Sequence, residues 1–220
     1  MVVAIMLGCA VAMLLDCWIM RQLETTTNRQ QLWRLAPVVG PLVRRDWVAL
    51  AVHLGAITIT SSLWHTYGWS ARFAVLLAAA VVLIYTAAVD WRVRLIDTLL
   101  MLGATAGALV FAPLLAGTWL NALLGTLVAA IVFVLLFMFA RILYPQQQAP
   151  FGLGDVYLGM FIGALVGVTD VGAALLRGMV LAGAASVVLL VVFGYRQARH
   201  MPIAYGAFLC VGVLLHLVIQ

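Results

Sequence analysis

The sequence predicts an all-α protein, a polytopic transmembrane helical bundle with about eight membrane spans. Of its 220 residues, 66% are hydrophobic and only 9% are charged, and the mean hydropathy is +1.18. A water-soluble domain needs a much larger share of polar residues to cover its surface. The apolar residues also fall into separate runs, most of them near the length of about 20 residues with which a helix crosses a bilayer.

The apolar runs place the expected spans near residues 2–20, 47–66, 71–89, 98–116, 119–143, 155–169, 172–194 and 204–219. We expect the first run to be a retained span, because a signal peptide carries positive charge before its apolar region. Here the first basic residue, Arg21, follows that run. A polar break between Pro145 and Pro150 separates the fifth run from the sixth, so the sixth helix is expected to start afresh.

The sixth run is short, and glycines recur along it at positions 152, 154, 159, 163 and 167. Small residues at such intervals allow the backbones of neighbouring membrane helices to approach closely. The tryptophans near the ends of the runs, at positions 47, 64, 69, 91 and 119, are typical of the aromatic belts at the two membrane surfaces.

The arginines predict the orientation of the bundle. Ten of them lie in segments 21–46, 90–97, 141–154 and 195–203, whereas the opposite side holds only Arg72 and Arg177. Basic residues concentrate in cytoplasmic loops. We therefore expect these four segments to face the cytoplasm and both termini to lie outside. This distribution is typical of cytoplasmic loops and not of a nucleic-acid-binding face, despite a formal charge of +5. The expected surroundings of the chain are therefore the lipid bilayer, and no nucleic acid is expected as a partner.

The whole chain, 1–220, is expected to form a single membrane domain with a short cytoplasmic loop at 21–46. That loop carries a run of Thr and Asn as well as Pro37, Gly40 and Pro41, which favours a surface-lying hairpin.

Two isolated carboxylates are the candidates for chemistry. Asp90 closes one apolar run, and Asp155 follows Gly152 and Gly154 at the head of another. Ionisable side chains in membrane segments are energetically expensive and usually functional. Charge counting places both at the cytoplasmic ends of spans. Two carboxylates close enough to share a proton can activate water and polarise a carbonyl group, as in aspartic hydrolysis.

Three segments resemble the type IV prepilin peptidases, which are GxGD intramembrane aspartic peptidases. Asp90-Trp-Arg-Val-Arg-Leu-Ile-Asp97 resembles the family segment in which an Asp ends one helix before a basic turn. Phe151-Gly-Leu-Gly-Asp-Val-Tyr-Leu158 is similar to its Gly-x-Gly-Asp-Val-Lys-Leu motif. Met201-Pro-Ile-Ala-Tyr-Gly-Ala-Phe-Leu209 is similar to the Pro-rich segment before the last helix.

This resemblance implies an aspartic endopeptidase of the bacterial inner membrane that removes the leader of type IV pilin-like precursors, in pilus assembly or type II secretion. It implies Asp90 and Asp155 as the catalytic pair, with backbone support from Gly152 and Gly154. Proteolysis is expected to need no cofactor. Many family members also methylate the new N-terminus with S-adenosylmethionine, an activity that no residue here identifies.

The chain departs from the family pattern at several positions. Tyr157 stands where the family usually has Lys, and Asp97 and Thr98 replace a Pro followed by Asp or Asn. Long members carry paired Cys-x-x-Cys motifs, thought to hold zinc, in the first cytoplasmic loop, but residues 21–46 contain no Cys. The chain therefore resembles a short, metal-free variant, and its scattered histidines do not suggest a metal site.

Structural alternatives exist for each acidic residue. Asp155 could cap its helix, Asp90 could anchor a helix end beside Arg92 and Arg94, and a capping role is favoured for Asp97. Asp16, inside the first run, could be functional or interfacial. The positions of the two residues at helix ends also predict different protonation states for Asp90 and Asp155. Asp155 lies at a helix N-terminus, which favours its charge, and Asp90 at a C-terminus, which favours a proton on Asp90.

A different class of protein also uses rare carboxylates and glycine-broken helices, namely a small transporter or proton-coupled channel subunit. Its sites are expected near the middle of the bilayer. The expected position of both carboxylates at helix ends favours the peptidase.

Overall fold

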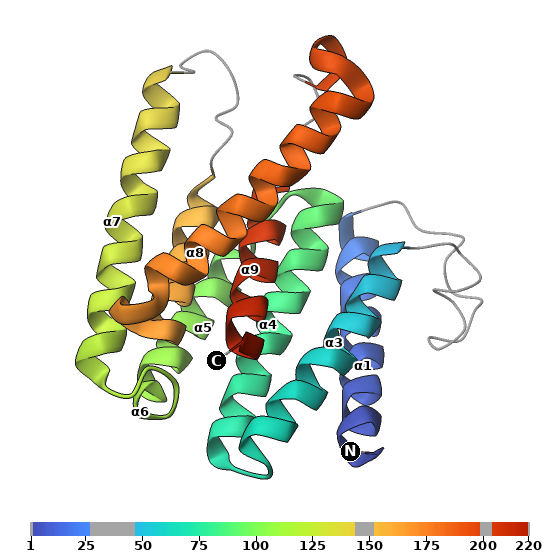
Figure 1. Ribbon diagram of the computed structural model, residues 1–220, viewed down its shortest axis with the longest axis vertical. Coiled ribbons are helices and arrows are strands. Elements are labelled where there is room, and N and C mark those ends of the chain that lie inside the picture. Colours follow the sequence, from blue (N-terminus) through green and yellow to red (C-terminus); the bar gives the residue numbers. More distant parts are fainter. Residues whose placement is uncertain (1, 27–46, 144–151, 199–203, 220) are drawn as a thin grey trace.

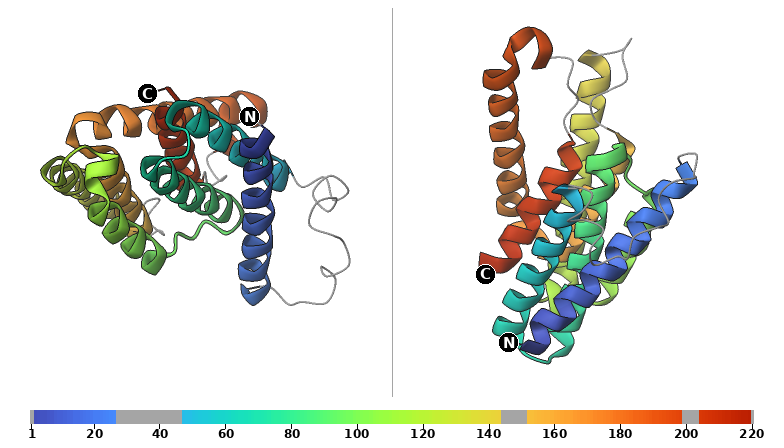
Figure 2. Two further views of the ribbon diagram at one scale, coloured as in Figure 1. Left: turned by 90° about the horizontal axis from the view of Figure 1, so that it is seen from below. Right: turned by 90° about the vertical axis from the view of Figure 1, so that its right-hand side faces the viewer.

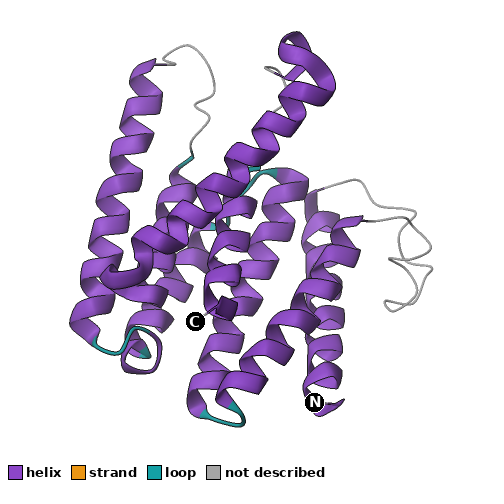
Figure 3. Cartoon of the chain, in the orientation of Figure 1, coloured by secondary structure: helices purple, strands orange, loops and turns teal. Residues whose placement is uncertain are grey.

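The computed structural model describes residues 2–26, 47–143, 152–198 and 204–219. Within these residues the regular structure is entirely helical (Figure 3), which confirms the all-α prediction. Most of the predicted loop at 21–46 lies outside the described residues.

The helices are α1 (Val2–Thr26), α3 (Trp47–Tyr67), α4 (Ala71–Val93), α5 (Thr98–Val110), α6 (Ala112–Leu115), α7 (Trp119–Leu143), α8 (Leu153–Ala198) and α9 (Tyr205–Ile219). By length and composition α3, α4, α7 and α8 can each cross a membrane, and α1, α5 and α9 contain shorter apolar stretches. Each predicted span is helical over most of its length, and the chain is a multi-pass membrane protein.

The helices form one bundle, in which α9 lies between α4 and α8 (Figures 1 and 2). On one side of it α4 packs against α3, which packs against α1. On the other side α8 packs against α7 and α5. Helix α9 therefore connects the half of the bundle that carries Asp90 with the half that carries Asp155.

Helix α8 is broken at Gly167 (φ 79, ψ 173) and again near its end at Gly194 (φ 73, ψ 159), and its two long limbs meet at Gly167. These limbs correspond to the predicted spans 155–169 and 172–194. Asn121, near the start of α7, stabilises the break: its Oδ1 accepts a hydrogen bond from the N–H of Val168 (2.9 Å), and its Nδ2 donates to the carbonyl of Ala116 (2.8 Å). A side chain on Gly167 would collide with Asn121.

Two element boundaries differ from the sequence prediction. The predicted span 98–116 is a helix only to Val110, followed by the single turn α6. Pro113 lies in that turn, and a proline cannot continue a preceding helix because it lacks an N–H and its ring collides with the turn before it. The first helix runs beyond the predicted residue 20 to Thr26. Arg, Gln, Leu and Glu at 21–24 are good helix formers even though they are mostly polar.

Three of the recurring glycines, Gly159, Gly163 and Gly167, approach a neighbouring helix closely, as predicted, and that helix is α7. A Cβ atom on Gly159 would lie 2.6 Å from the ring of Phe133, and one on Gly163 would lie 2.8 Å from the backbone nitrogen of Thr126. Gly125 of α7 faces Gly163 in the same way. The two helices therefore touch through their backbones at this point.

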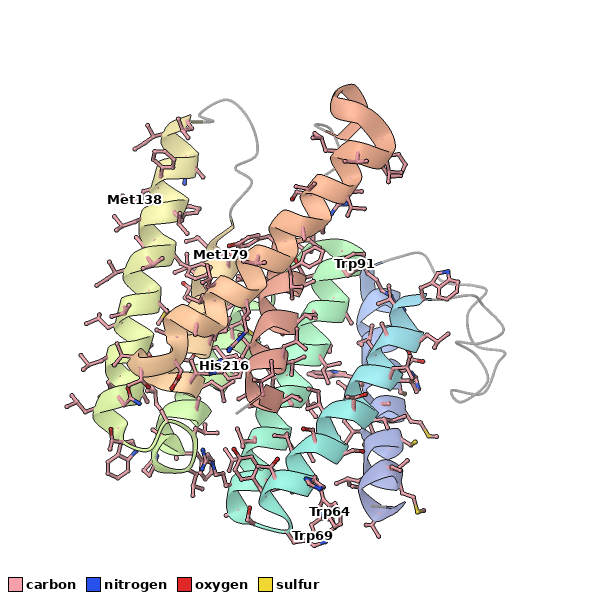
Figure 4. All side chains as sticks on the ribbon, viewed as in Figure 1. Trp64, Trp69, Trp91, Met138, Met179 and His216 are labelled. Atoms are coloured by element: carbon pink, nitrogen blue, oxygen red, sulfur yellow. The ribbon has the colours of Figure 1, made fainter. Side chains whose placement is uncertain are left out.

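The labelled tryptophans mark the two ends of the bundle. Figure 4 shows Trp64 and Trp69 at the lower end and Trp91 at the end where α4 finishes. Trp47, Trp69, Trp91 and Trp119 each expose more than half of their surface. This distribution agrees with aromatic belts at two membrane surfaces.

Candidate active site

Asp90 lies in the last turn of α4 and is 6% exposed. The helix ends at Arg94, which adopts the left-handed conformation (φ 55, ψ 39) and donates its N–H to the carbonyl of Asp90 (2.9 Å). The turn that follows, residues 94–97, leads directly into α5. Burial at a helix end leaves the Asp90 carboxyl group dependent on partners from elsewhere in the bundle.

The partner of Asp90 is the first turn of α9. Its Oδ2 accepts a hydrogen bond from the N–H of Ala207 (2.8 Å), and the N–H of Gly206 also interacts with this carboxyl group. Both N–H groups lie in the turn of a helix that normally needs a capping side chain. Ala204, which immediately precedes α9, cannot provide one. Asp90 therefore caps α9 from a different helix.

Asp155 is the third residue of α8. Its Oδ2 accepts a hydrogen bond from the N–H of Gly152 (3.0 Å), and its own N–H donates to the carbonyl of Gly152 (3.2 Å). A side chain that reaches back to the residue before the helix is half of a capping box. The capping alternative for Asp155 is thus realised, although Asp155 is inside the helix and Gly152 is the residue at its boundary.

Ile96, in the turn between α4 and α5, holds the starts of α8 and α9 together. A Cβ atom on Gly154 would lie 2.8 Å from Ile96 Cβ, and one on Gly206 would lie 2.9 Å from Ile96 Cδ1 and 3.0 Å from Asp90 Oδ2. Only glycine fits at either position without displacing a neighbour. The end of α4 and the starts of α8 and α9 are packed around this one side chain.

The two carboxyl groups belong to one cluster. Asp90 and Asp155 interact electrostatically with each other. The thiol of Cys210, in α9, is fully buried and interacts with both, and Tyr205 interacts with Asp155. We call Asp90, Asp155 and the backbone of Gly152, Gly206 and Ala207 the carboxylate site.

In each carboxyl group of this site, Oδ2 accepts a backbone hydrogen bond, from Ala207 in the case of Asp90 and from Gly152 in the case of Asp155. These bonds orient the two carboxyl groups. Pairing of this kind suits hydrolysis in which one group is a base and the other an acid.

The first turn of α9 changes the electrostatic argument that separated the two carboxylates. Asp155 lies at the N-terminus of α8, as predicted, but Asp90 lies both at the C-terminus of α4 and at the N-terminus of α9. The positive end of a helix therefore faces each of them. Helix ends alone no longer indicate which one carries the charge.

The other acidic residues considered in the sequence analysis, Asp97 and Asp16, lie outside the carboxylate site. Asp97 caps α5, as predicted, because its Oδ1 accepts hydrogen bonds from the N–H groups of Leu99 (2.9 Å) and Leu100 (3.2 Å). Arg94 interacts electrostatically with Asp90. Asp16 is buried in α1, at 9% exposure.

The sequence assigned no role to Ile96, Gly206 or Ala207, although all three lie in segments that resemble the family. The sequence signal for this contact is that α9 begins after Ala204, which has no side chain that could cap a helix. The N–H groups of the first turn of α9 must therefore find a hydrogen-bond acceptor elsewhere. The partner of that turn, more than a hundred residues earlier in the chain, is defined only by the packing of α9.

No group of three His, Cys, Asp or Glu side chains within the described ranges could hold a metal ion.

A cavity of about 300 Å³ lies between α4, α5, α6 and α8, lined by Ala, Val, Leu, Gly and Phe residues such as Ala78, Ala108 and Phe161. Neither carboxyl group lines it, so it is separate from the carboxylate site.

The comparisons with known proteins give one match. The model of the type IV leader peptidase family matches residues 77–195, just over half of the chain. This segment runs from α4 into the second limb of α8 and contains both Asp90 and Asp155. No curated protein and no solved structure matches the chain.

Proposed function

Because this chain belongs to the type IV leader peptidase family, we propose that it is a membrane-embedded aspartic endopeptidase. Its substrates are type IV prepilin-like precursors, and it removes their leader peptide at the cytoplasmic face of the bacterial inner membrane. The observation that carries the proposal is the pairing of Asp90 and Asp155, each held by a backbone N–H group, on either side of Ile96, which contacts the starts of α8 and α9.

The proposed reaction needs one proton on the pair. The ionised carboxylate takes a proton from a water molecule, whose oxygen attacks the scissile carbonyl carbon, while the protonated partner gives its proton to the carbonyl oxygen. The resulting gem-diol returns one hydroxyl proton to that partner as the C–N bond breaks. The leaving amine takes the proton from the first carboxyl group, so the pair regains its starting state.

The location of the site favours cleavage over transport. Both carboxylates lie at helix ends, and Arg94 interacts electrostatically with Asp90, whereas transporter sites are expected near the bilayer midplane. Family membership also favours a peptidase over a transporter or channel subunit. In our proposal the turn at 94–97 faces the cytoplasm, where a precursor's leader would arrive.

Co-expression with candidate prepilin-like precursors tests the function. We expect the precursor to become shorter on a gel, with cleavage that persists in EDTA because proteolysis by two carboxylates needs no metal. Mass spectrometry of the new N-terminus, with and without S-adenosylmethionine, reads out methylation in the same samples. Precursors that stay full length with purified, folded protein would contradict the proposed function, and loss of cleavage in EDTA would contradict its metal-free chemistry.

The orientation has its own test. A reporter fused after Gln220 is expected to report an extracytoplasmic location, and one inserted within 21–46 a cytoplasmic one, because ten of the twelve arginines lie on the side of that loop. Paired reporters active on opposite sides of the membrane, such as alkaline phosphatase and green fluorescent protein, provide the measurement. The inverted pattern would place the carboxylate site on the outer face and exclude cytoplasmic cleavage.

A further inference from the structure

Helix α9 crosses the second limb of α8 closely along the stretch from Leu209 to Gly212, which follows the carboxylate site on α9. A Cβ atom on Gly178 would lie 2.7 Å from Leu209 Cα, and one on Gly212 would collide with the backbone of Gly178. The two helices therefore touch through their backbones, as the first α8 limb and α7 do.

A polar pair lies at this crossing. Arg177, next to Gly178, is half-buried and its guanidinium group hydrogen-bonds Nδ1 of His216, one turn beyond Gly212. His216 is 3% exposed, and Figure 4 shows it between the second α8 limb and α9. Asp170 also interacts electrostatically with His216. A cation within a membrane helix is energetically expensive unless it has such a partner.

The carboxylate site depends on the position of α9 along its own axis. Ala207 and His216 belong to one unbroken helix, and a helix rises about 1.5 Å per residue. Sliding α9 by about one residue, 1.5 Å, would break the 2.8 Å hydrogen bond from Ala207 to Asp90. Small residues at a crossing allow close approach, but a directional hydrogen bond also selects one axial position.

We propose that Arg177 and His216 are positioning residues: their hydrogen bond fixes α9 along its axis so that the N–H of Ala207 reaches Asp90. This inference rests on the proposed function, since it assigns a purpose to a contact of the carboxylate site. It connects a pair deep in the bundle with the carboxyl group that carries the chemistry.

Two substitutions of similar polarity isolate the hydrogen bond. In His216→Asn the amide oxygen can occupy the place of Nδ1 and accept from Arg177, whereas in His216→Gln the amide group lies farther out, near the place of Nε2. We expect His216→Gln to lower kcat about tenfold with little change in KM, since small misplacements of catalytic groups are costly. His216→Asn is expected to retain most of the parent kcat. Leu176→Met, on the exposed neighbour of Arg177, is the control.

Infrared difference spectroscopy gives a readout that does not need cleavage. The carboxyl band of Asp90, identified by its loss in Asp90→Asn, is expected to move in His216→Gln and in Arg177→Met but not in His216→Asn or Leu176→Met. If His216→Gln only lowers thermal stability, with kcat and the Asp90 band unchanged, the pair is structural and the inference is wrong. Failure of the parent protein to cleave any precursor would instead contradict the proposed function, and the band would still decide the positioning role.

Discussion

Replacing either Asp90 or Asp155 by Asn is expected to abolish leader cleavage while the protein still inserts and folds. Loss of a general acid or base costs about a hundred- to ten-thousand-fold in rate. Asn suits this test because its side-chain oxygen can still accept the N–H of Ala207 or of Gly152, and Asn caps a helix about as well as Asp does. The measurement is the cleavage rate of a co-reconstituted precursor per unit of folded enzyme.

Asp97→Asn is the matched control. Asp97 also caps a helix, through the N–H groups of Leu99 and Leu100, but it lies outside the carboxylate site. We expect this variant to retain substantial activity. Robust cleavage by Asp90→Asn or Asp155→Asn would mean that the pair is held together only to cap α8 and α9.

Alanine at position 90 separates the two roles of that residue. Asp90→Ala removes the cap of α9 as well as the carboxyl group, and loss of a cap costs about 0.5–2 kcal/mol. The difference in stability between Asp90→Ala and Asp90→Asn therefore measures how much α9 depends on α4. That contact is one of those by which α9 joins α4 to α8.

Much of the fold could be predicted because the bilayer restricts the choice of structure. Apolar runs of membrane-spanning length must be helical, since unpaired backbone groups are not tolerated in lipid. The polar break before Phe151 correctly predicted a separate helix start for Asp155. The end of α5 at Val110 was missed because the apolar run continues through Pro113, and hydropathy does not register the missing N–H of proline.

The composition of the site was less predictable than its location. Asp90 and Asp155 stood out as charges in apolar sequence, but the donors to Asp90 are backbone groups and carry no signal of their own. Ile96 reads as an ordinary apolar residue until its contacts with Gly154 and Gly206 are known. The argument from helix ends had the same weakness, because α9 approaches Asp90 only through tertiary packing.

The backbone contact between α7 and α8 leads to a second large effect, on stability. In Gly163→Ala the new Cβ atom would lie 2.8 Å from the backbone nitrogen of Thr126 and closer still to the carbonyl of Gly125. Neither neighbour is a flexible side chain, so the two helices must move apart along the seam where Gly159 meets Phe133. We expect a loss of about 1–3 kcal/mol or more, typical of overpacked interiors.

The same substitution at Gly183 should have the opposite sign. Gly183 also lies in α8, but a Cβ atom there meets nothing within 4 Å, and alanine is favoured over glycine in a helix by about 0.8–1 kcal/mol. Thermal unfolding of both variants in nanodiscs measures this difference in stability.

Gly163 lies two turns beyond Asp155 on the same limb. Gly163→Ala is therefore also expected to slow cleavage in the fraction that remains folded, whereas Gly183→Ala is not. Equal shifts in melting temperature for the two variants would show that α7 and α8 are not in backbone contact, and Asp155 would then lack the support that this seam provides.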